Sequence, residues 1–579
     1  MNMSGVLTYI AFLGVLTILV RPVGGYLLRV FSGQRTVLDP LLLPVERGIY
    51  RLTGVDPTVE MDWREYAWAF IRFGVLGAIL LYLILRLQAF LPWYLPAWQT
   101  TPLTVDLSAN TAVSFATTTT WQAYGGEITM SYFSQMAGLT AQNFLAGAGG
   151  LAVGFAFIRG FAHHGVNHLG NFWVDFVRAL LWVLLPITVI VTPLLVWQGV
   201  PLNLNAYTLV QTLAGESHVL PQGPVAALEV IKNLGTNGGG FFNANGAHPF
   251  ENPTALTNVV EMLIIIIIPA GMTFAFGRMV GQPRHGWLLY WVMVMLFVLG
   301  GVACTWAERT GTPWAPAVGT DLATRLDGLA APGGNMEGKE LRFGIDGSVL
   351  TAITTSNTST GSYNSMHDSY TPVGGMVLMI NLLLGEIVFG GLGSGLYSML
   401  MVVLLALFLC GLMVGRTPEY LGKKLGPSET RMITIYTLAG TFAILIPTAI
   451  AVASPAGLAG LTTNKGAHGL SEILYAYASS MANNGQNFAG LSANSPFYNT
   501  TTALVMLVGR FGLAVVALAL AGLLATQRRR SISEGTFPAD APLFAIVVIG
   551  TALVVVGLSY FPALSLGPII EQLMMGRGT

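Results

Sequence analysis

The chain has 579 residues, of which 53% are hydrophobic and only 9% are charged, and its formal net charge at pH 7 is zero. Soluble domains carry about 25% charged residues, so this composition excludes an ordinary soluble protein and indicates an integral membrane protein surrounded by lipid. The balanced charge also lacks the basic excess that a nucleic-acid partner requires.

A helix needs about 20 apolar residues to cross the roughly 30 Å hydrocarbon core of a bilayer. Ten apolar runs of about this length or longer predict an all-α polytopic membrane protein with about ten transmembrane helices. The first run lacks a positive leading segment and a cleavage pattern, which favours a retained span over a signal peptide. The runs are Met3–Val20, Phe70–Phe90, Tyr132–Ile158, Ala179–Trp197, Thr257–Gly277, Gly286–Cys304, Gly374–Gly415, Ile433–Ser454, Thr501–Thr526 and Pro542–Phe561.

The positions of Lys and Arg predict the orientation, because these residues collect in cytoplasmic loops. They follow the first, third, fifth, seventh and ninth runs, whereas residues 91–131 contain neither. The segments after these five runs are therefore predicted to face the cytoplasm. The segments after the second, fourth, sixth and eighth runs are predicted to face outside. Both termini are predicted to lie outside as well.

The seventh run is 42 residues long, and its candidate breakers are the clustered glycines Gly390, Gly391, Gly393 and Gly395. Two full spans here would place the fourth polar stretch on the opposite face of the membrane from the other three. The Arg-rich segments that follow would then lie outside, against the expected distribution. We therefore predict one span broken at its glycines, with one arm lying aside or along the interface. The alternative is an unbroken span with a glycine-rich packing face.

Four polar stretches lie between pairs of apolar runs: TTTTWQAYGG, GTNGGGFFN, TSNTSTGS and MANNGQNF. Irregular backbone at membrane depth is tolerated only where protein encloses it or where it lines a watery cavity. The stretches therefore indicate four pore loops around one ion route. With Gln122, Gly238, Gly361 and Gly485 taken as equivalent points, the separations are 116, 123 and 124 residues, which predicts four repeated units of helix, loop and helix.

This repeat leaves one extra helix at each end of the chain and an extracellular insertion from Thr305 to Thr355. The expected division is residues 1–65 for the N-terminal span and a cytoplasmic loop, 66–171 for pore unit 1, 172–284 for pore unit 2, 285–431 for pore unit 3 with the insertion and the broken helix, 432–530 for pore unit 4, and 531–579 for the C-terminal span.

The four loops predict binding of a monovalent cation, with potassium preferred. Rings of backbone carbonyls replace the water shell of an ion, glycine allows the backbone to turn its carbonyls inward, and hard oxygen ligands disfavour soft metals. The candidate ligands are Thr118, Thr119, Thr120 and Gln122 in loop one, Asn237, Gly238 and Gly239 in loop two, Ser359, Thr360 and Gly361 in loop three, and Asn483, Asn484 and Gly485 in loop four.

Charged residues inside or beside apolar runs are further candidates, because a charge at membrane depth is costly. Arg510 lies within the ninth run, where it either forms an electropositive block near the pathway or pairs with a buried carboxylate such as Glu386 or Glu261. Glu127 and Asp368 follow loops one and three, and they either draw cations to the entrance or cap the helices that follow.

Seven strings resemble those of the potassium-binding KdpA family, the A subunits of the bacterial Kdp potassium-transporting ATPase. The resemblance implies the fold of the Trk, Ktr and Hkt potassium transporters and filter positions at Gln122, Gly238, Gly361 and Gly485. Loop three departs from the family pattern around its glycine, at Thr360, Tyr363 and Asn364. The strings are SYFSQMAGLTAQNF, GTNGGGFFNANGAHPFENPT, EGKELRFG, MHDSY, GEIVFGGLGSGLY, GRTPEYLGKK and FAGLSANSPF.

The resemblance also implies three partners, which are the catalytic P-type ATPase protein or B subunit, a C subunit and a small single-span F subunit. It further implies that the broken span, with Gly390, Gly391, Gly393 and Gly395, obstructs the pore below the filter, and that ions leave sideways through a tunnel toward the catalytic partner. The bacterial inner membrane is the implied location.

The chain contains no GxxxxGK[ST] phosphate loop and no DKTG phosphorylation sequence, so we expect it to bind no nucleotide and to catalyse no reaction itself. The leading hypothesis is a potassium-selecting subunit of an ATP-driven uptake complex. A stand-alone potassium channel or ion-coupled transporter is the alternative. In a third hypothesis the chain is a membrane scaffold whose loops serve only packing.

Overall fold

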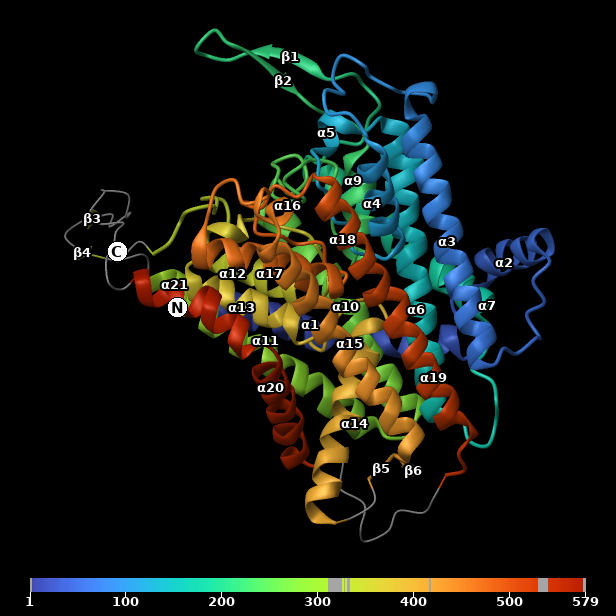
Figure 1. The fold of residues 1–579 in the computed structure, drawn as a ribbon. Coiled ribbons are helices and arrows are strands. Elements are labelled where there is room, and N and C mark those ends of the chain that lie inside the picture. Colours follow the sequence, from blue (N-terminus) through green and yellow to red (C-terminus); the bar gives the residue numbers. More distant parts are fainter. Residues whose placement is uncertain are drawn as a thin grey trace.

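A computed structural model describes residues 3–310, 325–326, 329–330, 334–415, 418–529 and 540–575. Helices dominate these residues (Figure 1). The strands form three antiparallel hairpins, of which β1–β2 projects from the top of the molecule in Figure 1. The hairpins are Thr208–Gln211 with Ser217–Leu220 (β1–β2), Arg325–Leu326 with Leu329–Ala330 (β3–β4), and Glu419–Tyr420 with Lys423–Lys424 (β5–β6).

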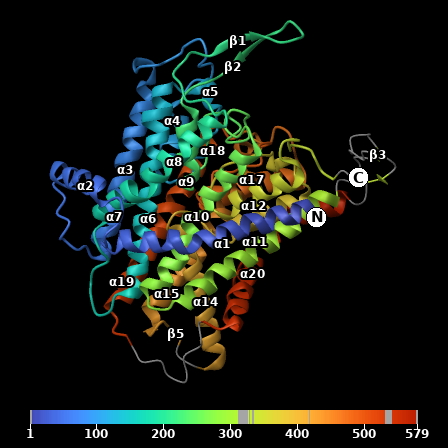
Figure 2. The ribbon, with the colours of Figure 1, turned by 180° about the vertical axis from the view of Figure 1, so that it is seen from behind.

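Ten helices in the described residues are long and apolar enough to cross a membrane, which confirms the predicted number. The start of α1 and the end of α21 lie on the same side of the molecule in both ribbon views (Figures 1 and 2). The ten are Gly5–Phe31, Trp63–Phe90, Ser134–Ala162, Phe172–Trp197, Ala255–Met279, Pro283–Thr310, Ser394–Met413, Pro427–Ala453, Pro496–Thr526 and Pro542–Met575.

The four repeated units each contain an outer helix, a short pore helix and an inner helix that pack on one another. Unit 1 has α3 (Trp63–Leu87), α4 (Val105–Ala116) and α6 (Ala141–Ala162), and unit 2 has α8 (Leu185–Trp197), α9 (Val225–Leu234) and α10 (Ala255–Met279). Unit 3 has α11 (Pro283–Thr310), α12 (Gly344–Asn357), α13 (Pro372–Leu383) and α14 (Ser394–Val414), and unit 4 has α15 (Pro427–Ala453), α17 (Gly466–Met481), α18 (Pro496–Leu507) and α19 (Leu513–Thr526). The exact unit boundaries stay a prediction.

The remaining helices flank the units or extend their spans. They are α1 (Met3–Phe31), α2 (Asp39–Thr53), α5 (Gly126–Thr129), α7 (Phe172–Arg178), α16 (Pro455–Leu458), α20 (Pro542–Leu564) and α21 (Ile570–Met575), with short η segments at Gln88–Phe90, Ser134–Thr140, Ala179–Leu184, His367–Ser369, Val508–Gly512 and Ser565–Ile569. Four of these η segments are π-helical turns inside spans, at Ser134, Ala179, Val508 and Ser565.

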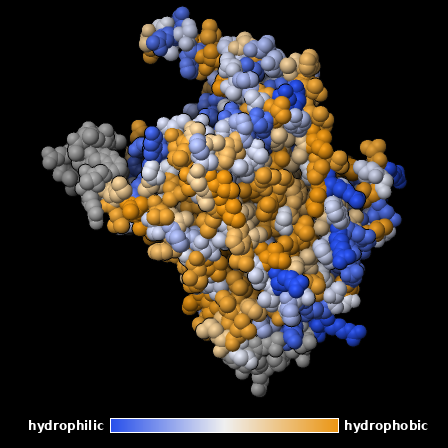
Figure 3. Space-filling model, viewed as in Figure 1, coloured by the Kyte–Doolittle hydropathy of each residue, from blue (hydrophilic) through white to orange (hydrophobic). Residues whose placement is uncertain are grey.

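Inner and outer helices differ in burial. In the most apolar window of each span, 83% of the residues are buried in the span that contains α6, but only 17% in α15. Exposed apolar side chains of α15 and α20 include Phe442 and Leu558. Figure 3 shows apolar residues across the middle of the face that carries α15, α18 and α20. These helices therefore present a lipid-facing surface around a buried inner ring.

Two predicted boundaries were wrong. The first helix continues from Val20 to Phe31, because the helix packs along α10 and the Phe31 ring stacks on Phe155 with centroids 3.8 Å apart. The residues expected to form an insertion include Thr305–Thr310, which complete α11, and Gly344–Asn357, which form the third pore helix. Residues 311–324 of that segment lie outside the described residues.

The seventh apolar run confirms the predicted broken span. Its first arm is α13, and only the second arm, α14, is long enough to cross a membrane. The break spans residues 384–393, where Gly385, Glu386, Phe389 and Gly393 have positive φ. The short arm packs against α17 and α20, so it lies aside as expected.

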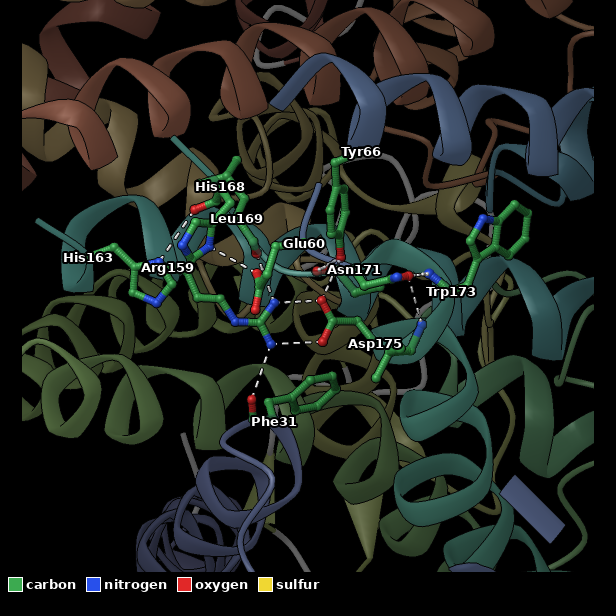
Figure 4. Close-up of polar contacts among 12 residues, drawn as sticks. Phe31, Glu60, Tyr66, Arg159, His163, His168, Leu169, Asn171, Trp173 and Asp175 are labelled. Atoms are coloured by element: carbon green, nitrogen blue, oxygen red, sulfur yellow. Dashed lines mark hydrogen bonds and ion pairs between the residues drawn. The ribbon is translucent and has the colours of Figure 1, made fainter. Parts of the chain in front are cut away.

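A buried ion pair ties unit 1 to its neighbours (Figure 4). Arg159 on α6 makes two hydrogen bonds to the Asp175 carboxylate, at 2.5 and 2.7 Å, and also donates to the carbonyls of Leu169 and Phe31. Tyr66 donates to Asp175 from α3 at 2.9 Å. The pair thereby joins the end of α1, α3, α6 and α7.

We predict that Asp175→Ala lowers the free energy of unfolding by about 3–5 kcal/mol, because it leaves the Arg159 guanidinium buried without its counter-charge. The matched control is Glu60→Ala, which removes the exposed partner of His168 and is expected to cost about 0–1 kcal/mol. The midpoint of thermal unfolding in detergent measures both. Equal midpoints for the two variants would contradict this role.

Candidate functional site

Four pore helices end at the same relative position in the four polar loops. Their C-cap residues are Thr117, Gly235, Thr358 and Ala482. The C-terminus of a helix carries partial negative charge, so each pore helix directs a favourable field toward a cation bound at its end.

These caps correct the predicted register of loop one. Three residues after each cap stand Thr120, Gly238, Gly361 and Gly485, so Thr120 and not Gln122 occupies the position of the glycines. The Gln122 side chain instead accepts from the Gly240 N–H at 2.8 Å and donates to its carbonyl at 3.2 Å. Gln122 therefore holds loop two from the side.

The first three loops touch in sequence order. The Thr120 hydroxyl donates to the carbonyl of Asn237 at 2.6 Å, which joins loops one and two. Gly238 forms a parallel bridge with Gly361, and the Gly361 N–H donates to the Asn237 carbonyl at 3.5 Å, which joins loops two and three. Gly239 also lies beside Gln122 and Thr120.

Loop four closes the ring. The Ser359 hydroxyl donates to the carbonyl of Ala482, which joins loops three and four. The Asn483 amide donates to the Thr119 hydroxyl at 2.9 Å, which joins loops four and one. Asn484 donates to the carbonyl of Thr355 at the end of the third pore helix. The four loops thus converge into one closed ring, as the sequence predicted.

The ring holds its backbone in a conformation that most side chains avoid. Thr118, Thr236, Ser359 and Asn483 stand one residue after the caps, and all four have φ between 48° and 63°. Non-glycine residues rarely adopt positive φ, and such strain clusters at functional sites. Four copies of the same strained position indicate a backbone arranged for ligand binding.

Glycine is required in the ring by close approach as well as by φ. Gly238 has φ 87°, and a Cβ atom there would lie 2.1 Å from the Gly361 nitrogen. A Cβ atom on Gly485, which has φ 86°, would lie 2.0 Å from the Thr119 carbonyl oxygen. Gly361 does not share the positive φ, so the third loop differs from the second and fourth.

The break in the seventh span lies directly against loops two and three of the ring. The Leu392 N–H donates to the Thr236 hydroxyl at 2.9 Å, and a Cβ atom on Gly391 would lie 3.5 Å from the Ser359 side chain. A Cβ atom on Gly393 would collide with the Gly150 carbonyl of α6 at 2.0 Å. Gly390 and Gly395 pack against each other in the same way.

Arg510 and Glu386 are both buried near this break. The Arg510 guanidinium donates to the Ala146 carbonyl at 2.9 Å, and its Nε atom has no hydrogen-bond partner within the part of the chain that the structure describes. Glu386 accepts from the Ser394 hydroxyl at 2.5 Å. Among the described residues no ion pair within 4.0 Å joins Arg510 to Glu386 or Glu261. Direct pairing, the structural alternative, is therefore wrong.

Glu127 lies in the first turn of the short helix α5, as the capping alternative expects, whereas Asp368 does not cap α13. Thr371 caps α13 with its own side chain, and Asp368 bonds to His468 at 3.0 Å. The Glu127 carboxylate accepts from the Asn243 N–H of the second loop at 2.9 Å. Both acids brace the outer rim of the ring.

Sequence reasoning missed a group of buried charges behind loop two. The fully buried Lys232 ammonium on α9 donates to the Gly239 carbonyl and pairs with Glu229, each at 2.8 Å. Glu251 accepts from the Phe241 N–H at 2.7 Å. The sequence does hold one indication of this group, because Lys232 is the single Lys or Arg in residues 198–256. These charges fix the position of the second polar loop.

We predict that Lys232→Met lowers the free energy of unfolding by about 3–5 kcal/mol, because Glu229 stays buried without a counter-charge. Lys465→Met is the matched control, since Lys465 is exposed, and its effect is expected within about 0.5 kcal/mol. Thermal unfolding in detergent compares the two variants. A Lys232→Met protein as stable as the parent would contradict the importance of this pair.

Comparison with known proteins fits this architecture. The potassium transporter TrkH from Vibrio parahaemolyticus superposes with a TM-score of 0.50 over 78% of this chain and 82% of its own, at 13% sequence identity. At this identity the likeness shows the fold alone, which this chain shares with TrkH over most of its length.

Other proteins are much more similar to this chain in sequence. The potassium-transporting ATPase potassium-binding subunit of Methylobacterium nodulans is 51% identical over 100% of this chain and 99% of its own length. The protein of the same name from Brucella anthropi is 49% identical over 100% of both chains. The family model described as potassium-transporting ATPase A subunit matches residues 10–573. The chain therefore belongs to the family of potassium-transporting ATPase A subunits.

Proposed function

We propose that this chain binds extracellular potassium in the ring of four loops and passes it across the membrane as the channel-like subunit of an ATP-driven uptake complex. The closed ring carries the proposal, because it brings the peptide oxygens and hydroxyls of four separate loops to the ends of four pore helices. Relatives named for potassium binding, about 50% identical over the whole chain, support the same function.

The chemistry of the ring favours potassium. Its lining consists of Thr, Ser, Asn and Gly, without an acidic side chain at the four aligned positions. Carbonyl and hydroxyl oxygens substitute for the water shell of a weakly hydrated monovalent cation. The proposed ligands in loop one are Thr118, Thr119 and Thr120, and Gln122 supports them by holding loop two.

The energy for transport comes from partners in this proposal. The chain has neither a phosphate loop nor a DKTG sequence, and its relatives are named as subunits of an ATPase. A catalytic P-type B subunit would hydrolyse ATP, and the C and F subunits would complete the complex in the bacterial inner membrane. A stand-alone channel or ion-coupled transporter is less favoured, because the relatives are subunits of an ATP-driven complex.

The exit route is proposed to turn sideways below the ring. The break at residues 384–393 lies under the filter, and beside it is a cavity of about 110 Å³ between α14, α15, α17 and α20. Its lining is mostly apolar, but it includes the polar side chains of Glu386, Ser394 and Tyr436 and reaches Ala482 at the end of the fourth pore helix. This direction leads toward the lipid-exposed α15 and α20, where a partner protein would receive the ion.

The intact complex tests the function directly. ATP hydrolysis by the purified complex is expected to rise with potassium and to respond less to rubidium and sodium. Potassium current from the purified chain alone would instead select the channel alternative. Hydrolysis that is indifferent to all three cations would contradict the proposal.

Gly238→Asp is expected to lower discrimination for potassium over rubidium and sodium, because it places a charged side chain where Gly361 leaves no room. The matched control is Gly199→Asp, since Gly199 also has positive φ but no atom within 4 Å of its added Cβ. Cation dependence of ATP hydrolysis is the measurement. Unchanged cation selectivity in Gly238→Asp would show that loop two is not part of the selectivity filter.

Arg510→Ala is expected to raise ATP-independent potassium flux without unfolding the protein, because a buried positive charge repels cations strongly in a poorly screened site. Arg510→Lys keeps the charge and is expected to keep the flux low. Ion flux into reconstituted vesicles and thermal unfolding are measured together. Loss of folded protein in the alanine variant, with normal flux in the remainder, would assign Arg510 a structural role only.

A further inference from the structure

One group of metal-ligating side chains lies outside the filter, where three separate elements meet. Asp368 follows loop three, His468 and Glu472 are one turn apart on α17, and Glu571 is on α21. Ligand atoms of Asp368, His468 and Glu472 lie within 4.8 Å of one another. This trio joins pore unit 3 to pore unit 4.

The two ring nitrogens of His468 have different surroundings. Nδ1 lies 2.8 Å from a Glu571 carboxylate oxygen. Nε2 faces Asp368 at 3.0 Å and Glu472 at 3.9 Å. A carboxylate on one nitrogen of a histidine fixes the tautomer and leaves the other nitrogen as a metal ligand, an arrangement found at most histidine metal sites.

Glu472 is a buried carboxylate with one unsatisfied oxygen. Its side chain has no exposed area. Oε1, the oxygen that faces His468 at 3.9 Å, accepts from Asn464 at 2.8 Å, while Oε2 has no hydrogen-bond partner among the described residues. Buried carboxylates are normally paired or bound to a metal. In the part of the chain that the structure describes, the three carboxylates around His468 have no ion pair with Lys or Arg.

We propose that Asp368, His468 and Glu472 bind one divalent metal ion, with zinc the best fit. Zinc accepts imidazole nitrogen together with carboxylate oxygen, and a set of three protein ligands leaves its fourth position for water. Glu571 is a positioning residue that orients His468. A metal here would fasten α21 and the loop after filter three to the fourth pore helix, at the outer rim of the pore.

A proton on His468 would compete with the metal ion for the Nε2 atom. Burial acts to lower the pKa of His468, but hydrogen bonds to Asp368 and Glu571 outweigh it and raise the pKa to about 10. Without metal, an imidazolium held by carboxylates would fill the site. The test must therefore separate a metal site from an ion-pair clasp.

Isothermal titration calorimetry with zinc chloride distinguishes a metal site from an ion pair. The full chain is first purified with a chelator, and the chelator is then removed. We expect one zinc ion per chain. Glu571→Gln should weaken binding roughly 10–100-fold while keeping the stoichiometry, and Glu472→Gln and His468→Gln should weaken it more. Glu216→Gln and His218→Gln, on the exposed β1–β2 hairpin, are the matched controls. Calcium and magnesium titrations test the preference for a nitrogen ligand.

The proposal would be overturned if the parent protein bound no zinc. It would also be overturned if the parent, Glu472→Gln and His468→Gln bound zinc equally well. Either result would show that His468 and its carboxylates form only an ion pair. X-ray absorption of the zinc-loaded parent gives an answer that does not depend on variants. One nitrogen and two carboxylate ligands are expected, and any sulfur or multiple-histidine signature contradicts the site. None of these measurements depends on potassium binding, so the proposed transport function stands or falls separately.

Discussion

The structure depends on the closure of four dissimilar loops into one ring. Neighbouring contacts in the ring are made by different groups: a hydroxyl to a carbonyl at Thr120, a backbone bridge at Gly238, a hydroxyl to a carbonyl again at Ser359 and an amide to a hydroxyl at Asn483. Because neighbouring contacts differ, the ring cannot rotate by one loop and keep its bonds. One polypeptide therefore fixes the arrangement that separate identical chains would obtain by symmetry.

The strain of this ring is offset by hydrogen bonds both behind it and within it. Residues with positive φ are costly. The compensation comes from Lys232 behind loop two, which holds the Gly239 carbonyl, and from Asn484 in loop four, which donates to the Thr355 carbonyl near the end of the third pore helix. Buried ion pairs do little for net stability but fix geometry when both partners are present. The charges behind loop two are thus best understood as positioning devices.

The sequence predicted the spans, the four loops and the broken seventh helix, because hydropathy and glycine content are local properties. It did not predict the register of loop one, since a run of four threonines contains no landmark and only the end of α4 at Ala116 sets it. Nor did it predict the length of α1, where Arg21 and Arg29 suggested a loop but packing against α10 continues the helix. Lys232 was visible, and Glu229 lies one helical turn before it, but the burial of this pair depends on tertiary structure.

The asymmetry of the four units has a consequence for the ion path. Three inner spans continue past the ring as unbroken helices, whereas the third is interrupted at residues 384–393, and that interruption contacts loop two through Leu392 and lies close to loop three at Gly391. An ion leaving the ring along its axis would meet this segment and the nearby Arg510 charge. Glu386 and Ser394 beside the break supply polar groups to a cavity whose lining is otherwise mostly apolar. In the proposed transport function, a sideways exit would follow from this one broken helix, and the proposed partner would then receive the ion.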